Sequence, residues 1–322
     1  MKKKLDNIEI KIYKNIDDIK KKFPYPYNKE MLKLLKEENK FHQEYHYIKR
    51  ENSYSFLIIY KNMMNLLTFG KLKFYYPLKV IGYPCSLSVN GYITNDESLT
   101  YEYIKSIKGA KLVLNVNEDL NLNEFTKGYT LPTCIFKNNF NSLNEYINSL
   151  RSNYRKRINK CLKNTKNISI IYNSKEDIYD LYLNTYNKSN YKLEKLERDF
   201  FKKVNGEIIL FKENDIKRGF ILLNKNKSKL TFMLCGMNYE YDTTDLYYRM
   251  LLEIINYAIN NKCKIIDFGQ TSEETKLKMG CTLEEKYFYA NHHNKIINYI
   301  VNKSKSLLEY EYSFPDYKVF KE

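Results

Sequence analysis

The sequence of 322 residues has no tryptophan, only four histidines and six widely scattered cysteines. With so few histidines and no Cys-x-x-Cys pair, we predict no metal site. No apolar run reaches the roughly 18 residues that a membrane-spanning helix needs, so we predict no transmembrane segment. The basic start, Met1 to Asp6, has no apolar segment behind it. We therefore expect no secretion signal, a cytoplasmic location and free thiols.

Motifs of several enzyme classes are also missing. The chain contains no P-loop, no dinucleotide-binding fingerprint, no Gly-x-Ser-x-Gly and no zinc-ligand spacing. It is nevertheless 43% hydrophobic with 32 tyrosines, and its length suits two domains with sizeable cores. The formal net charge is +16. Such a charge favours an anionic partner such as a nucleic acid, CoA or a lipid-linked phosphate, but lysine enrichment from codon bias would explain it equally well.

The stretch 264–280 organises the second half of the chain. Residues 264–268 form a short apolar run bounded by Gly269, which is typical of a buried strand. Thr271 and Glu274 have the spacing of a capping box, so a helix is expected to begin at Thr271 and to end at Gly280. Asp267 lies at the carboxyl end of the strand, which is where ligands bind in open α/β sheets.

This stretch also carries a family resemblance. The run Asp267-Phe268-Gly269-Gln270-Thr271, followed by Lys276-Leu277-Lys278-Met279-Gly280, resembles the late strand and following helix of the GNAT superfamily of N-acyltransferases. It is similar in particular to the branch of the Fem-type peptidoglycan aminoacyltransferases and the related acetyltransferase-like proteins of peptidoglycan biosynthesis and recognition.

The order of the expected elements supports the resemblance. Residues 165–302 give the order β-α-α-β-β-β-α-β-α-β-β, with a closing pair of strands at 285–289 and 296–301. The first half repeats this order more faintly, and a basic helix expected at 142–162 joins the halves. We predict an α+β fold of tandem GNAT-like units, each a mixed, mostly antiparallel sheet flanked by helices. The expected segments are a degenerate N-terminal unit at 1–140, the bridging helix at 141–164 and an acyltransferase domain at 165–322.

The resemblance implies a donor site on the fourth strand of the second unit, residues 230–237. A bulge at Cys235, Gly236 and Met237 would present backbone N–H groups to the acyl carbonyl, although Gly236 could equally serve close packing. Thr243 and Thr244 begin the next helix and either bind a phosphate or only cap it. The loop 238–244 departs from the family's glycine-rich pyrophosphate loop, since it has two acids and no glycine. In this respect it resembles the Fem-type enzymes, which use aminoacyl-tRNA.

Three side chains are candidates for the chemistry. Asp267 would be the general base or the amine anchor, unless it only holds the turn. Glu273 could act as base through a water. Lys276 matches the family's lysine and would offset developing negative charge, unless it is one more solvated lysine.

A cluster of arginines is the last candidate. Arg151, Arg155 and Arg157 on the basic helix resemble the arginines that meet acceptor phosphates in the Fem branch.

Together these features predict an N-acyltransferase. It would move an acetyl or aminoacyl group from acyl-CoA or aminoacyl-tRNA, as a co-substrate and not a tightly bound cofactor, to an amine by direct attack. The acceptor would be an amine-bearing small molecule or a cell-wall precursor, with tRNA as a further partner. The alternative is a non-catalytic GNAT-like protein that binds an anionic ligand.

Overall fold

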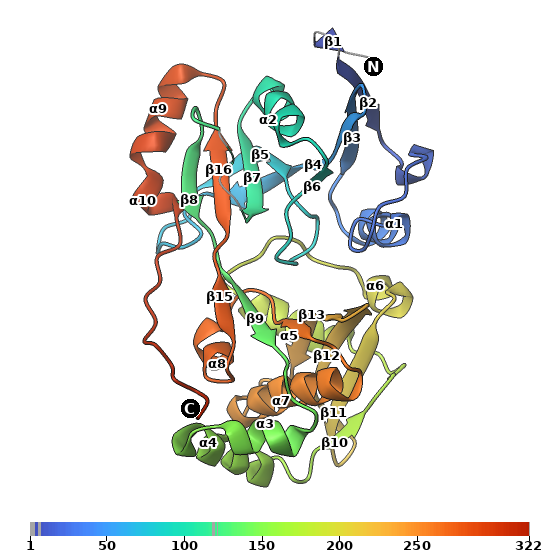
Figure 1. Cartoon of the computed structure of the whole chain (residues 1–322), viewed down its shortest axis with the longest axis vertical. Helices are drawn as coiled ribbons and strands as arrows, with labels where there is room; N and C mark the ends of the chain where they lie inside the picture. Colours follow the sequence, from blue (N-terminus) through green and yellow to red (C-terminus); the bar gives the residue numbers. More distant parts are fainter. Residues whose placement is uncertain (1–3, 6–7, 118–119, 121, 322) are drawn as a thin grey trace. The chain divides into compact units, whose positions relative to one another are not determined.

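The structure is a computed structural model that describes residues 4–5, 8–117, 120 and 122–321. Most of the start of the chain, on which the expectation of no secretion signal rests, lies outside these residues. The chain forms two compact units (Figure 1). The first comprises Met1–Leu131, Asn190–Phe200 and Glu285–Tyr312, and the second comprises Pro132–Ser189, Phe201–Glu284 and Ser313–Glu322. These segments interleave along the chain, whereas the sequence suggested successive ones.

The first unit is a nine-stranded sheet with helices. Its path runs β1-β2-β3-β4-β5-β7-β16-β8, and β6 pairs with β4. The strands are β1 (Lys4–Leu5), β2 (Ile8–Tyr13), β3 (Glu44–Arg50), β4 (Ser53–Asn65), β5 (Tyr75–Ile81), β6 (Tyr92–Thr94), β7 (Lys111–Val116), β8 (Thr126–Tyr129) and β16 (Tyr287–Asn291). The helices are the 3-10 helix η1 (Ile16–Asp18), α1 (Lys29–Glu38), α2 (Glu97–Ser106), α9 (Lys295–Lys303) and α10 (Lys305–Leu308).

The second unit is a seven-stranded sheet with the order β10-β11-β12-β13-β14-β9-β15. The strands are β9 (Thr133–Lys137), β10 (Ser169–Ile171), β11 (Glu207–Glu213), β12 (Ile216–Asn226), β13 (Lys229–Met237), β14 (Ile265–Asp267) and β15 (Thr282–Glu284). The helices are α3 (Leu143–Ser149), α4 (Ser152–Asn164), α5 (Tyr179–Lys188), α7 (Thr244–Asn260) and α8 (Glu273–Leu277). The boundary between the units falls within α6 (Arg198–Lys203).

The two sheets repeat one topology. In the first, β5 and β7 are parallel and connected through α2; in the second, β13 and β14 are parallel and connected through α7. The other strand pairs in both sheets are antiparallel among the described residues. Each sheet also takes one strand from the other half of the sequence: β16 lies between β7 and β8, and β9 lies between β14 and β15. The prediction of tandem, mixed, mostly antiparallel sheets is confirmed. The degenerate character of the first unit stays a prediction.

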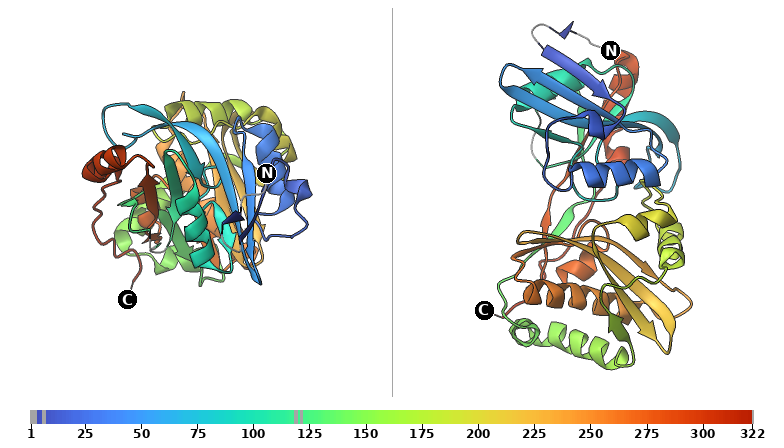
Figure 2. Two further views of the ribbon diagram at one scale, coloured as in Figure 1. Left: turned by 90° about the horizontal axis from the view of Figure 1, so that it is seen from above. Right: turned by 90° about the vertical axis from the view of Figure 1, so that its right-hand side faces the viewer.

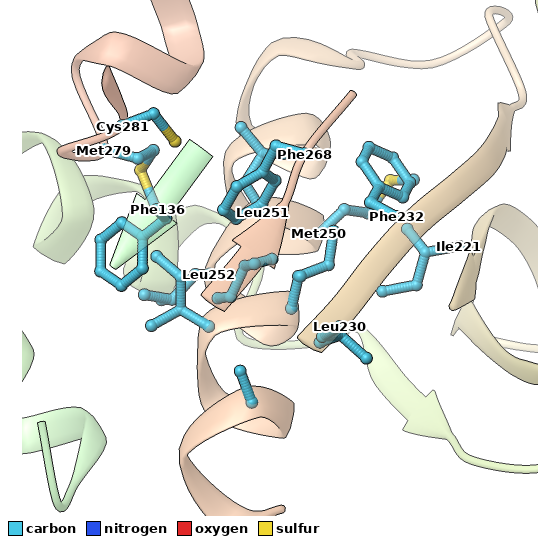
Figure 3. Close-up of a cluster of buried hydrophobic side chains, with 14 of the residues drawn as sticks. Phe136, Ile221, Leu230, Phe232, Met250, Leu251, Leu252, Phe268, Met279 and Cys281 are labelled. Atoms are coloured by element: carbon cyan, nitrogen blue, oxygen red, sulfur yellow. The ribbon is translucent and has the colours of Figure 1, made fainter. Parts of the chain in front are cut away.

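The core of the second unit explains why β9 belongs there. Phe136 of β9 belongs to the same buried cluster as Leu230 and Phe232 of β13 and Met250 of α7, and its ring centroid lies 6.4 Å from that of Phe268 (Figure 3). Alternate residues of β9 are thus fully buried against α7, which covers this face of the sheet, while α5 covers the other face (Figure 2). Because an apolar alternation fits either sheet, the sequence alone did not reveal the exchange.

Three predicted elements are wrong in detail. Residues 296–301 belong to helix α9 and not to a strand, because the Asn294 side chain caps the N–H groups of Ile296 and Ile297. The helix expected at 142–162 is broken into α3 and α4 at Leu150, whose backbone bridges to Phe320. The capping box at Thr271 does not form: helix α8 begins at Glu273.

Candidate functional site

The carboxyl ends of β13 and β14 define the candidate site. These strands pair in parallel over three residue pairs, and the pairing ends at Thr231 and Asp267. Strand β13 nevertheless continues to Met237, so the two strands no longer pair toward their carboxyl ends. The register between β12 and β13 shifts at Met233, which is the bulged residue. The sequence predicted the bulge at Cys235 to Met237, and the structure has it two residues earlier, at Met233.

The predicted donor-binding residues of β13 are largely engaged within the unit. A Cβ on Gly236 would lie 2.4 Å from the ring of Phe220 and 2.5 Å from the Leu181 carbonyl, so this glycine permits close packing of α5. The Met237 N–H donates to the Thr185 hydroxyl at 3.1 Å. Cys235 is partly exposed, and burial of its thiol raises its pKa to about 11.

The turn between β14 and α8 has an unusual backbone. Gly269, Thr271 and Ser272 all have positive φ angles, of 67°, 64° and 53°. Such angles suit glycine but are strained for threonine and serine, and they persist only where surrounding contacts fix them. The structure shows these contacts on both sides of the turn.

Asp267 is the first of these contacts. Its Oδ1 accepts hydrogen bonds from the Gly269 N–H and the Thr133 hydroxyl, both at 3.0 Å, and its Oδ2 pairs with the Lys229 ammonium at 2.8 Å. Burial of this carboxyl, which is 4% exposed, would raise its pKa, but the lysine and the hydrogen bonds outweigh it and lower the pKa. A well-paired carboxylate of lowered pKa is a turn anchor and a poor general base at neutral pH.

Lys276 is the second contact. It is 2% exposed, and its Nζ donates to the carbonyls of Gln270 at 2.9 Å and Gly269 at 3.3 Å. Burial lowers the pKa of this lysine, while three neighbouring thiols and the Glu273 carboxyl act against that shift. Lys276 is thus a buried cation beneath the turn and not a solvated surface lysine.

Glu273 lies one helical turn before Lys276. Glu273 is 6% exposed, and its Oε1 has no hydrogen-bond partner among the residues that the structure describes. A buried acceptor without a donor is uncommon, and it is typical of a position where a ligand or a water binds. Tyr247 of α7, which the sequence did not single out from the other tyrosines, lies beside the Ser272 side chain of the same turn. Burial raises its pKa well above the ordinary value, so its phenol stays protonated.

The N-terminus of α7, where a donor phosphate was expected, has an acid instead. Thr243 precedes the helix without capping it through its side chain. The Thr244 N–H donates to the Asp242 carboxylate at 3.0 Å. A carboxylate at the position of the pyrophosphate competes with it for the helix dipole and for N–H groups.

The three arginines have different surroundings. Arg151 precedes α4 and binds the C-terminal segment through its backbone N–H and its Nε, which donate to Val319 and Phe320. Arg157 pairs with Asp245 and stacks on a tyrosine of α7. Arg155 is half-buried, and no ion pair of its side chain is found among the described residues.

Within the described residues, no three His, Cys, Asp or Glu side chains gather in a way that could hold a metal ion. Nor does any helix in that part of the chain have the length and apolarity needed to cross a membrane.

Comparison with known proteins agrees with this architecture. No family model and no curated protein matches the sequence. Among solved structures, the C-terminal domain of an Agrobacterium fabrum protein assigned as a lysylphosphatidylglycerol synthetase is similar at 8% identity, with 78% of this chain and 84% of that chain covered and a TM-score of 0.51. FemX is similar at 13% identity, covering 81% and 90%, with a TM-score of 0.47. A tandem GNAT protein from the clavulanic acid pathway is 6% identical, covering 77% and 82%, with a TM-score of 0.44. At these identities the likeness is one of fold alone, and the first of these structures, with a TM-score above 0.5, supports an α+β fold of mixed sheets flanked by helices.

Proposed function

We propose that the chain is an N-acyltransferase whose site lies where β13 and β14 separate. The observation that carries the proposal is the buried pair Glu273 and Lys276 beneath a strained turn at this point. An acyl carbonyl in the gap would meet backbone N–H groups of β13 that no strand covers on that side, and these would stabilise the oxyanion. The bond that forms joins the amine nitrogen to the acyl carbon, and the donor's thiol or tRNA hydroxyl leaves.

Glu273 is the residue we assign as general base. The attacking amine must lose a proton, and the Glu273 Oε1, which no described residue hydrogen-bonds, accepts it directly or through a water. Lys276 holds the turn and supplies positive charge close to the developing oxyanion. Tyr247, which keeps its proton because burial raises its pKa, is the residue that we assign to protonate the leaving group. Asp267 acts by fixing the turn rather than by taking the proton.

Either acyl-CoA or aminoacyl-tRNA could be the donor, and the acceptor is an amine-bearing small molecule or cell-wall precursor. The acids of the loop 238–244 disfavour the usual CoA pyrophosphate mode, and Asp242 at the start of α7 supports the same conclusion. The same observation supports the second candidate, a GNAT-like protein that binds an anionic ligand without catalysis.

A donor screen tests the proposal. Acyl-CoAs and charged tRNAs are offered with candidate amines and peptides, and transfer is followed by mass gain. We expect transfer from one donor class, and we expect Glu273→Gln to lower turnover about 10²–10⁴-fold with the fold intact. Glu274→Gln is the matched control, because that neighbour is exposed and pairs with Lys278. Equal turnover of the wild type and Glu273→Gln would remove Glu273 from the chemistry, and binding without transfer would favour the second candidate.

A further inference from the structure

Helix α9 of the first unit is amphipathic, but its apolar face is exposed and its polar face contacts the rest of the unit. Its apolar side chains face solvent: Ile296 is 73% exposed, Tyr299 62% and Ile300 56%, and Leu307 of α10 continues the row at 61%. The spacing i, i+3 and i+4 places the three residues of α9 on one helical face, and Leu307 follows in α10, a separate short helix. We call these four residues the α9 surface. No residue of α9 or α10 is buried. Scattered exposed apolar residues are ordinary, but a continuous row of them marks an interaction site.

The polar face of α9 explains why the helix keeps this orientation. The Asn298 Nδ2 donates to the Glu124 carbonyl at 3.0 Å, and its Oδ1 accepts from the His292 N–H at 3.0 Å. The Asn302 Oδ1 accepts from the Thr126 hydroxyl at 2.5 Å. Rotating the apolar row inward would break all of these bonds, so hydrogen bonding to the rest of the unit keeps the apolar face outward.

Basic residues surround the α9 surface. Lys295, Lys303 and Lys305 are exposed along the same two helices. Among the nearby acids, Glu309 pairs with Lys305 at 3.6 Å, while Glu124 and Glu311 are exposed. The hairpin between β4 and β5 also has exposed apolar side chains next to exposed lysines. Its connection, residues 66–74, contains exposed Leu72 and Phe74 together with two exposed lysines.

The hairpin and the end of α10 are neighbours within this unit. The ring of Phe69, in the hairpin connection, lies 5.1 Å from that of Tyr310, which follows α10, and both rings contact Tyr191. Figure 1 and Figure 2 show the hairpin beside the red helices.

From this geometry we propose that the α9 surface docks on an anionic lipid membrane surface. Apolar side chains on one helical face with lysines beside them enter the boundary between headgroups and acyl chains, and the lysines gain from anionic lipid. A second copy of the chain fits less well, because a two-fold contact through this face would bring the lysines of both copies together. This inference does not depend on the proposed transferase activity.

Because the chain has no tryptophan, a single introduced tryptophan reports on its own position without background emission. Tyr299→Trp introduces the only tryptophan in the chain, and Tyr241→Trp, at an exposed site of the second unit, is its control. The probe is vesicles of phosphatidylcholine with or without phosphatidylglycerol. We expect the emission of Trp at 299 to shift to the blue and to be quenched by brominated lipid only with the anionic vesicles. The control should not respond.

Sedimentation with the same vesicles measures the two contributions separately. Ile296→Gln with Ile300→Gln should lower vesicle binding at least about tenfold, whereas Ile171→Gln with Ile216→Gln, two exposed isoleucines of the second unit, should not. Each of Lys295→Gln, Lys303→Gln and Lys305→Gln should lower it about fivefold. Absent binding, equal binding to neutral vesicles, or unchanged binding of the isoleucine variant would overturn the proposal. So would a stable dimer that Ile296→Gln and Ile300→Gln dissociate, because a second copy would then cover the surface.

Discussion

Replacing Asp267 by asparagine separates its two possible roles, because a turn anchor and a general base predict opposite results. Asparagine can still accept from Gly269 and Thr133 through its carbonyl oxygen, but its amide would face the Lys229 ammonium. That ammonium is 45% exposed and can turn to water. The loss is therefore one charge-assisted hydrogen bond, about 1.5–3 kcal/mol of unfolding free energy. At about 2–4 °C per kcal/mol for a unit of this size, the melting temperature should fall by roughly 3–12 °C.

Lys229→Met is the informative companion variant. It leaves the Asp267 carboxylate buried without its cation, which typically costs about 3–5 kcal/mol. We therefore expect Lys229→Met to be less stable than Asp267→Asn, although Lys229 is the more exposed residue. Calorimetry or thermal circular dichroism measures both. If Asp267→Asn keeps the wild-type melting temperature and lowers turnover about 10²–10⁴-fold, the carboxylate is the base and the anchor assignment is wrong.

Acid should remove the stabilisation that the Asp267 carboxylate provides. The folded-state pKa of Asp267 is lowered, so the unfolded chain takes up the proton first as the pH falls. The stabilisation is fully present above the unfolded-state pKa of about 4 and is lost as the pH falls through the folded-state value. The difference in unfolding free energy between the wild type and Asp267→Asn should therefore shrink below about pH 4. A difference that grows in acid would contradict the sign of this shift.

Three further predictions concern other residues of the second unit. Glu273→Gln should lower the free energy of unfolding, because it removes the carboxyl that offsets the buried charge of Lys276, whereas Glu274→Gln, at an exposed position, should change it little in chemical denaturation. Gly236→Ala should destabilise the unit by about 1–3 kcal/mol in urea, because the new Cβ would lie 2.4 Å from a phenyl carbon and 2.5 Å from a helix carbonyl. Arg155→Gln should raise the KM of an anionic substrate and weaken its salt dependence without a change in melting temperature, whereas Arg157→Gln should lower that temperature.

Local patterns in the sequence predicted the central part of the second unit well. The apolar runs at 230–237 and 264–268 predicted two strands, and the structure forms them as β13 and β14. Gly280 has the positive φ of 95° that a helix stop favours. These features depend on neighbours in the chain, so periodicity and turn residues were enough to find them.

Features that depend on distant contacts were not predictable in this way. The exchange of β9 and β16 between the sheets changes no local pattern. The β-branched residues of α9 favour a strand in the sequence, which is why the helix was not predicted. No residue of α9 is buried, so no core-facing apolar stripe marks it as a helix, and only its asparagines have helical spacing. A lysine in a lysine-rich chain gives no sign of burial either, and Lys276 is buried only because the turn carbonyls converge on it.

The strained turn after β14 has a consequence for specificity. Three contacts fix it. The Asp267 carboxylate accepts from the Gly269 N–H, the Cys134 N–H of β9 donates to the Gly269 carbonyl at 3.0 Å, and the Lys276 ammonium donates to the turn carbonyls. A backbone held this firmly presents Glu273 in one position and loses no entropy when substrate binds. The β13 side of the gap has no second strand to fix it beyond Thr231. Discrimination between donors should therefore come from β13 and the loop 238–244, while the α8 side determines the proton transfer. Exchanging that loop for a glycine-rich one should change the donor preference toward acyl-CoA and leave the effect of Glu273→Gln unchanged; a swap that alters both equally would show that the two sides do not act separately.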